Sequence, residues 1–258
     1  MLAEAPDDFD GEAATPAASH LFAINPEPVR LSSEMANEFH HLVAKTLFVC
    51  KRARPDIQLT VGFLCGRVKD PDTDDWKKLR RLFQYLRGTK ELALTLEADN
   101  TTVAKWWIDA SFAVHSDCRS QSGAAFTLGR GAPYSSSKKQ KVNGKSSTEA
   151  ELIAVDDFMG QVLWTQNFLR AQGYWVQSST IYQDNQSAML LEKNGRKSGS
   201  KRTKHLDVRY YFITDRIKKG EVTVQYCPTA DMVADFFTKP LQGAAFRKFR
   251  DAILNIQD

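Results

Sequence analysis

Apolar residues recur at steps of three and four over about residues 32–88, which is the period of a helix with one buried face. Pro55 and Pro71 interrupt this pattern, and Gly88 suits the C-terminal cap of its last segment. The sequence therefore predicts a small unit of three helices. Residues 1–30 show little periodicity and are rich in Ala, Pro, Asp and Glu, so we expect a flexible acidic lead-in.

The period shortens to two after residue 90, where alternating apolar and polar positions predict β-strands. The expected strands cover about residues 92–96, 103–109, 124–128, 133–137, 180–183 and 221–226. Stripes of helical period predict helices over about residues 148–170, from 186 onward, 203–219, 231–238 and 243–254. Early strands followed by alternating helices and strands predict a mixed α/β domain over residues 91–258, after a helical unit over residues 31–90.

Composition restricts the class of protein. The apolar fraction of 42% supports packed cores, and four scattered cysteines without metal-binding spacing indicate reduced thiols in an intracellular protein. No apolar run reaches the length of a membrane span, and the acidic N-terminus does not resemble a signal peptide. We therefore expect neither membrane insertion nor secretion, with a cytoplasmic or a nuclear location left open.

Positive charge is concentrated in two segments of a chain whose formal net charge is +4. Residues 138–145 hold four Lys and no acid, and residues 193–219 hold ten Lys and Arg against two acids. A basic surface of this kind favours a polyanion as ligand. For either basic segment considered alone, a surface exposed only to solvent is the simpler explanation.

Four acidic residues occupy positions where a carboxylate is normally costly, because each ends a strand-like run or lies on the apolar side of a helix-like run. They are Asp109, Glu151, Asp184 and Asp235. Each has an ordinary alternative role, as a turn residue, a helix cap or a first-turn acid favoured by the helix dipole. If the four meet in one pocket, their repulsion requires a cation, and two Mg²⁺ ions held in this way cleave phosphodiesters.

Glu149 and Glu151 both open the long predicted helix, and helix geometry separates their roles. Ser146 with Glu149 and Thr148 with Glu151 fit the capping box, so both acids have a structural explanation. Glu151 shares a face with apolar residues four, seven and eleven positions further on, whereas Glu149 lies on a more mixed face. We predict that Glu151 binds metal and that Glu149 caps the helix.

Several stretches resemble one family. They are residues 136–141 (SSKKQK), 146–151 (SSTEAE), 182–185 (YQDN), 204–213 (KHLDVRYYFI) and 234–241 (ADFFTKPL), and, upstream, 54–57 (RPDI) and 85–90 (YLRGTK). In this order, over about residues 31–254, the chain resembles the C-terminal part of copia-type LTR retrotransposon Pol polyproteins. That part comprises the segment after the reverse-transcriptase palm, followed by the ribonuclease H region.

The resemblance implies a ribonuclease H fold, an α/β arrangement with a mixed five-stranded sheet flanked by helices. By motif, Asp109, Glu151, Asp184 and Asp235 match the metal-binding carboxylates of the family. The implied reaction is hydrolysis of the RNA strand in an RNA–DNA hybrid with two Mg²⁺ ions, for which Mn²⁺ is an expected substitute, and recognition of a 2′-OH separates RNA from DNA. Candidate contacts to the hybrid backbone are Lys138, Lys139, Lys141, Lys145, Lys201, Arg202, Lys204, His205 and Arg209.

The chain departs from the family pattern in two respects. Many ribonucleases H carry a mobile His before the last Asp, thought to aid product release, and residues 225–229 (QYCPT) contain none. His205 is a candidate replacement, although phosphate binding or helix capping explains it more simply. An acidic doublet of the reverse-transcriptase type is absent from the sequence, so we expect a chain without the polymerase centre, which makes the polymerase part a candidate partner.

Two alternatives stay open. Asp156 and Glu192 have 35 residues between them, a spacing typical of transposases and integrases of the same fold, but Asp156 falls inside a predicted helix rather than at a strand end. The second alternative is a catalytically inactive nucleic-acid-binding remnant of a retrotransposon. The four intact carboxylates argue against it, and metal-dependent cleavage distinguishes the two cases.

Overall fold

A computed structural model describes residues 2–99, 103–194 and 207–256, with the backbone alone for residues 207–211. The chain divides into two compact units, Met1–Thr95 together with Lys239–Asp258, and Leu96–Thr238. It therefore leaves the first unit after Thr95 and returns to it at Lys239, whereas the predicted boundaries keep residues 91–258 in one domain.

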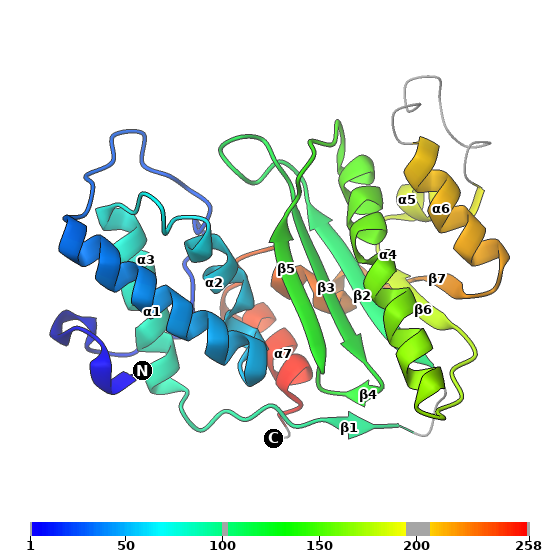
Figure 1. Ribbon diagram of the computed structural model, residues 1–258, viewed down its shortest axis with the longest axis horizontal. Helices are drawn as coiled ribbons and strands as arrows, with labels where there is room; N and C mark the ends of the chain where they lie inside the picture. Colours follow the sequence, from blue (N-terminus) through cyan, green and yellow to red (C-terminus); the bar gives the residue numbers. More distant parts are fainter. Residues whose placement is uncertain (1, 100–102, 195–206, 257–258) are drawn as a thin grey trace. The chain divides into compact units, whose positions relative to one another are not determined.

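The first unit is helical (Figure 1). Its elements are α1 (Ser33–Arg52), α2 (Gln58–Cys65), α3 (Thr73–Gly88) and α7 (Gly243–Leu254), with 3-10 helices η1 (Leu2–Glu4), η2 (Asp7–Phe9) and η3 (Pro55–Ile57). The three helices predicted over residues 32–88 are confirmed. The lead-in differs from the expected flexible segment, because Phe9 is fully buried and its ring packs edge-on against Trp76 and Phe83. Burial of one aromatic ring offsets part of the entropy lost by ordering this segment.

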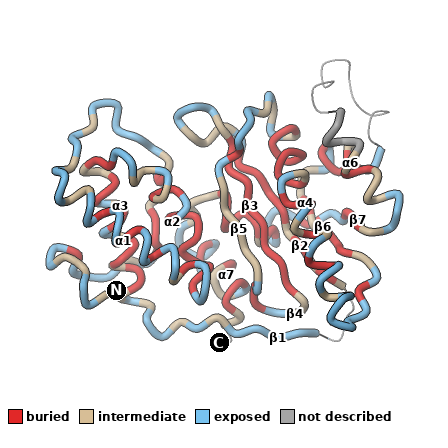
Figure 2. The backbone as a smooth tube through the Cα atoms, viewed as in Figure 1, coloured by how far each residue is buried: buried red, intermediate tan, exposed pale blue. Residues whose placement is uncertain are grey.

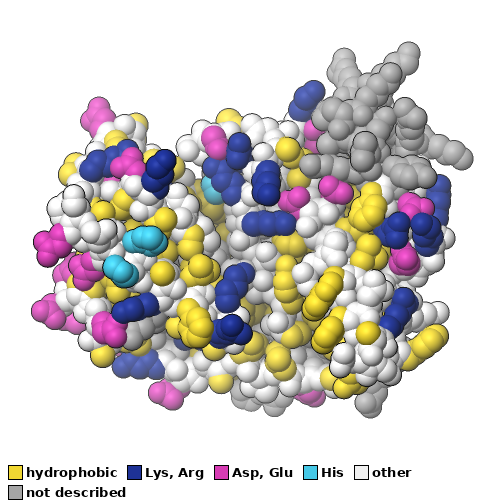
Figure 3. All heavy atoms as spheres, in the orientation of Figure 1, with side chains coloured by type: hydrophobic (Ala, Val, Ile, Leu, Met, Phe, Trp, Pro, Cys, Tyr) yellow, Lys and Arg dark blue, Asp and Glu magenta, His cyan; other side chains and the backbone are white. Residues whose placement is uncertain are grey.

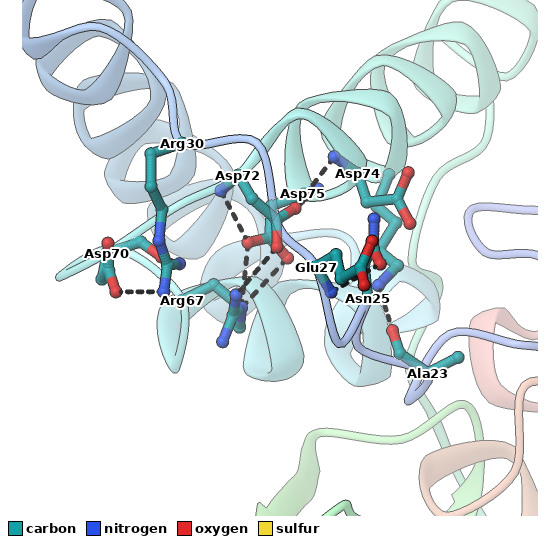
Figure 4. Close-up of polar contacts among 10 residues, drawn as sticks. Ala23, Asn25, Glu27, Arg30, Arg67, Asp70, Asp72, Asp74 and Asp75 are labelled. Carbon is teal, nitrogen blue, oxygen red and sulfur yellow. Dashed lines mark hydrogen bonds and ion pairs between the residues drawn. The ribbon is translucent and has the colours of Figure 1, made fainter.

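Helix α3 begins at a capping box built from two Asp residues (Figure 4). The Asp72 carboxylate accepts hydrogen bonds from the backbone N–H groups of Asp74 and Asp75, and the Asp75 carboxylate accepts one from the N–H of Asp72. Arg67 donates to both carboxylates, at 3.2 Å to Asp72 and 2.9 Å to Asp75. The guanidinium compensates the two largely buried charges, and together these groups fix the start of the helix.

A buried ion pair gives the two upstream motifs a structural role. Arg54 donates two hydrogen bonds to the Asp56 carboxylate, at 2.8 and 2.7 Å, and two more to Thr89. The Tyr85 hydroxyl donates to the same carboxylate at 2.7 Å. Burial, and then the charge of Asp56, raises the pKa of Tyr85 well above its ordinary value. Motif residues therefore hold the segment before α2 against the end of α3.

The second unit contains a mixed five-stranded sheet flanked by helices, as the resemblance implies (Figure 1). Its strands are β2 (Ala104–Ser111), β3 (Gln121–Thr127), β5 (Tyr134–Lys139), β6 (Ser179–Gln183) and β7 (Val222–Tyr226), in spatial order β5-β3-β2-β6-β7. Strand β3 pairs antiparallel with β2 and β5, whereas β6 pairs parallel with β2 and β7. A separate two-stranded ladder joins β1 (Glu97–Ala98) to β4 (Gly129–Arg130).

Helices cover one face of this sheet and a 3-10 segment covers the other (Figure 1). The elements are α4 (Ser147–Ala171), α5 (Gln186–Asn194) and α6 (Asp207–Lys218) on the first face, and η7 (Val233–Phe237) on the second; the exposed η6 (Thr229–Asp231) precedes η7. Trp106 and Ile108 of β2 point into the core shared with α4, and Figure 2 shows that β3 is buried along its length.

Two predicted elements differ from those observed. The segment over residues 92–96 forms no strand, because the backbone N–H of Thr95 bonds to the carbonyl of Leu254 rather than to a neighbouring strand. The segment predicted as helical over residues 231–238 consists of 3-10 turns. The backbone N–H of Asp235 donates to the carbonyl of Met232, and the backbone N–H of Thr238 donates to the carbonyl of Asp235.

Candidate metal centre

Strand register brings two of the predicted carboxylates together. On the parallel neighbours β2 and β6, Trp107 is paired with Tyr182, and their rings stack at a centroid distance of 4.9 Å. Asp109 and Asp184 follow two residues later, on the same sides of their strands, near the carboxyl end of β2 and directly after that of β6. Because neighbouring strands lie about 4.8 Å apart, the two carboxylates project side by side from one edge of the sheet.

The third carboxylate comes from the start of α4. Ser146 caps this helix by accepting a hydrogen bond from the N–H of Glu149, and the Glu149 carboxylate accepts one from the preceding loop at 2.7 Å. Gln140, fully buried, donates to the carbonyl of Ala150 at 2.8 Å, which ties the first turn of α4 to the end of β5. Glu149 therefore serves the cap, as predicted, and Glu151 extends toward the strand ends.

Asp109, Glu151 and Asp184 form a group in which each places a carboxylate oxygen within 4.8 Å of the other two. We call it the three-carboxylate group; two of its members are buried and Asp184 is half-buried. At this distance two charges repel by about 1 kcal/mol in water and by about 3 kcal/mol at an effective dielectric constant of 20. A divalent cation offsets this repulsion, and carboxylate oxygens are the ligands that Mg²⁺ and Mn²⁺ prefer. The donor set therefore fits a hard divalent ion.

Asp235 lies outside the three-carboxylate group, in η7, where it is 6% exposed. Thr238 connects it to the group, because its hydroxyl donates a hydrogen bond to the Asp109 carboxylate and lies 3.4 Å from the carbonyl oxygen of Asp235. The structure thus brings three of the four predicted ligands together and places the fourth in the adjoining segment.

Two threonines that contact the carboxylates were missed by sequence reasoning. Thr229 donates to Asp184 at 2.8 Å, and Thr238 donates to Asp109. A Thr hydroxyl does not change the pattern of apolar and polar positions, so only the location of each Thr in the sequence could have indicated its role. Thr238 lies inside a motif of the family, and Thr229 lies in residues 225–229, which contain no His.

Two titratable groups near the site have shifted pKa values. Burial raises the pKa of the Cys227 thiol, and the negative charges of Asp231, Asp184 and Asp235 raise it further. Burial also lowers the pKa of His115, which lies in the loop after β2. At neutral pH we therefore expect a protonated Cys227 thiol beside the carboxylates and a neutral His115 imidazole in the loop after β2.

Four of the predicted nucleic-acid contacts can be placed. Lys138 and Lys139 end β5 at the same edge of the sheet as Asp109, and Lys141 and Lys145 follow as exposed residues. Lys138 donates to a carbonyl of α4 at 3.2 Å, and Lys139 pairs with Asp117 at 2.7 Å. Figure 3 shows Lys and Arg side chains gathered over β5. The remaining predicted contacts lie outside the described residues, in whole or by their side chains: Lys201, Arg202, Lys204, His205 and Arg209.

The alternative pair of acids is placed differently from a transposase site. Asp156 lies in the interior of α4, and Glu192 is fully buried in α5. Among the described residues, neither carboxylate oxygen of Glu192 has a hydrogen-bond partner, and burial raises its pKa to about 8. A protonated buried acid is a poor metal ligand, so this alternative loses support.

Comparison with known proteins identifies the family. The chain is 31% identical over 245 residues to the retrovirus-related Pol polyprotein from transposon TNT 1-94 of Nicotiana tabacum, a match that covers 93% of this chain and 18% of that protein. The polyprotein from transposon RE2 of Arabidopsis thaliana is 34% identical over 198 residues, covering 76% of this chain and 14% of its own length. The chain belongs to the copia-type retrotransposon Pol family. It spans less than a fifth of the length of these two polyproteins.

Solved structures and family models add further comparisons for this copia-type Pol chain. LC11-RNase H1, isolated from compost by a metagenomic approach, matches 54% of the chain and 94% of its own with a TM-score of 0.41 and 11% identity. No family model matches the sequence. Within the described ranges, none of the helices is both long enough and apolar enough to cross a bilayer.

Proposed function

We propose that this copia-type Pol chain is a metal-dependent nuclease that cleaves the RNA strand of RNA–DNA hybrids. The main support is the three-carboxylate group at the carboxyl edge of the sheet, with ligand oxygens within 4.8 Å of one another. Membership of the Pol family and the motifs that resemble its ribonuclease H region support the same conclusion.

In this proposal Asp109, Glu151 and Asp184 hold Mg²⁺ or Mn²⁺, with Asp235 as the fourth ligand. When bound, two such ions supply an activated water and stabilise the leaving 3′-oxygen. The protein contributes orientation. The stacked rings beneath Asp109 and Asp184 keep the two strand ends at a fixed spacing, and the capped first turn of α4 holds Glu151 toward them. Carboxylates held in place before the substrate arrives need little reorganisation during the reaction.

The proposed substrate follows from the charges at the same edge of the sheet. Lys138, Lys139, Lys141 and Lys145 would contact phosphates of the hybrid, and the basic residues from Lys201 to Arg209 are proposed to extend this contact. If so, affinity for a hybrid falls steeply with salt, because each neutralised phosphate releases a counterion. Joint replacement of Lys141 and Lys145 by Ala should lower the slope of log affinity against log salt by about 2. An unchanged slope would remove them from the interface.

The decisive experiment is cleavage of a hybrid labelled on its RNA strand, in Mg²⁺ and in Mn²⁺. Glu151→Gln removes one charge from the three-carboxylate group, and Glu149→Gln is a matched control two residues away that keeps an acceptor for the helix cap. We expect RNA cleavage by the wild type and by the control, and a rate lower by at least about 100-fold in Glu151→Gln.

The other outcomes have distinct meanings. Equal cleavage by Glu151→Gln and the wild type would refute the assignment of Glu151 as a ligand. Binding of the hybrid by the wild type without cleavage in either metal would favour a catalytically inactive nucleic-acid-binding remnant.

A further inference from the structure

Thr238 joins the candidate metal centre to the segment that follows it. The residue is fully buried, and its hydroxyl donates a hydrogen bond to Oδ2 of Asp109. Its backbone N–H donates to the carbonyl of Asp235 at 3.2 Å, and its hydroxyl lies 3.4 Å from the same oxygen. One side chain therefore connects the carboxylate at the end of β2 to the 3-10 segment that carries Asp235.

The backbone beside Thr238 is itself held on the sheet by a line of hydrogen bonds. Ser137 of β5 donates to the carbonyl of Phe237 at 2.6 Å, and Gln121 of β3 donates to Ser137 at 2.8 Å. His115 places its Nε2 2.9 Å from the side-chain oxygen of Gln121. Because the bonds cross two strands, the position of Thr238 relative to the sheet is fixed independently of its own hydroxyl.

Gly123 lets η7 approach the sheet at this point. It is paired with Asp109 in the antiparallel register of β2 and β3, on the face that η7 covers. A Cβ at this position would lie 2.7 Å from Cγ2 of Thr238 and 2.9 Å from the carbonyl oxygen of Ala234. Such separations are shorter than packed atoms allow, so a side chain here would push η7 away. The absence of a side chain is what brings the Thr238 hydroxyl within reach of Asp109.

We infer that Thr238 is a positioning residue that fixes the Asp109 carboxylate in the orientation needed to bind a divalent metal. The inference rests on the proposed function and deepens it. A carboxylate has two oxygens, so a donor on one restricts rotation of the group and leaves the other available to a cation. Removal of partners of this kind typically weakens metal binding by about 10–100-fold.

The test is titration calorimetry of Mn²⁺ with the full chain, comparing Thr238→Val, Thr238→Ser and the wild type. Val preserves the shape of Thr and removes the hydroxyl, whereas Ser preserves the hydroxyl. Thr165→Val is the matched control, because Thr165 is 7% exposed, accepts a hydrogen bond from Gln161, and lies about 20 Å along α4 from Glu151. We expect Mn²⁺ binding at least about 10-fold weaker in Thr238→Val, and within about threefold of the wild type in Thr238→Ser and the control.

Each result decides the inference. If Thr238→Val bound Mn²⁺ with wild-type affinity, the inference about Thr238 would be overturned and the proposed function would stand. An equal loss of affinity in Thr238→Val and Thr238→Ser would also overturn the inference, because it would indicate a packing effect. Failure of the wild type to bind Mn²⁺ would overturn both. Circular dichroism checks that each variant is folded; if Thr238→Val is not, Thr238→Ala removes the same hydroxyl with a smaller side chain and replaces it in the comparison.

Discussion

Replacement of Asp184 by Asn is expected to stabilise the metal-free protein and to remove most of its stabilisation by metal. The ligand oxygens of Asp184, Asp109 and Glu151 lie within 4.8 Å of one another, so the change removes two repulsive pairs of charges. Each pair contributes about 1 kcal/mol at a dielectric constant of 80 and about 3 kcal/mol at 20. Asn still accepts the 2.8 Å hydrogen bond from Thr229. Because Asp184 is only half-buried and water reaches it, we expect a gain near the lower end, about 1–2 kcal/mol.

The order of stability should reverse when metal is added. A cation that binds only the folded protein, present at 100 times its dissociation constant, stabilises that protein by about 3 kcal/mol. The wild type should gain this amount in Mn²⁺. Asp184→Asn lacks one ligand and should gain less than about 1 kcal/mol under the same conditions, since its dissociation constant rises by about 100-fold.

Urea unfolding with and without Mn²⁺, followed by far-UV circular dichroism, measures this reversal. Asp231→Asn is a suitable control, because Asp231 is an exposed acid of η6 that lies outside the three-carboxylate group. The control should gain the same stability from Mn²⁺ as the wild type. If Asp184→Asn were less stable than the wild type without metal, and Mn²⁺ stabilised both equally, the reasoning that these carboxylates repel one another and share a cation would be refuted.

Three further predictions concern packing and burial. Asp56→Ala leaves Arg54 buried without its counter-ion and should lower the free energy of unfolding by about 3–5 kcal/mol in urea; a loss below about 1 kcal/mol would contradict this role. Gly123→Ala should cost about 1–3 kcal/mol and weaken Mn²⁺ binding in calorimetry, unlike Gly160→Ala, whose Cβ would meet no atom within 4 Å. Burial raises the pKa of Glu192 from 4.5 to about 8, so the folded protein keeps a proton that the unfolded chain loses, and stability should fall as pH rises through this interval. Glu192→Gln should flatten that fall in unfolding experiments, and an unchanged slope would argue against the buried acid.

Much of the second unit could be predicted from the sequence, because apolar positions in several of its elements recur with the period of a strand or of a helix. The alternation around Trp106 and Ile108 marked β2, and the long stripe after Glu151 marked α4. Single positions left an ordinary alternative role for each acid, whereas the resemblance to the family implied that Asp109, Glu151 and Asp184 meet, as they do in the structure. The family motifs fixed the order of the four acids along the chain, and no single acidic position was specific enough to indicate the site by itself.

The remainder depended on contacts between residues far apart in the chain. Thr238 and Asp109, which share a hydrogen bond, are 129 positions apart in the sequence, and no local pattern of residues predicts that contact. Helix α7 was assigned to the second domain because an amphipathic stripe shows that a helix has a buried face, not which surface that face covers. In the structure Phe246 of α7 packs on Tyr85 of the first unit, at a centroid distance of 5.7 Å.

The first unit is assembled from both ends of the chain, whereas the second is one uninterrupted stretch. A ribosome therefore completes the sheet and its carboxylates before it completes the helical unit. At about 5–20 residues per second, the roughly 160 residues from Tyr85 to Phe246 take about 8–30 s to translate. During that interval the nascent first unit exposes to water the apolar surface that α7 will cover. We therefore expect chaperones to bind the nascent chain at its helical unit rather than at its sheet. Without chaperones, we expect aggregation to begin at the helical unit.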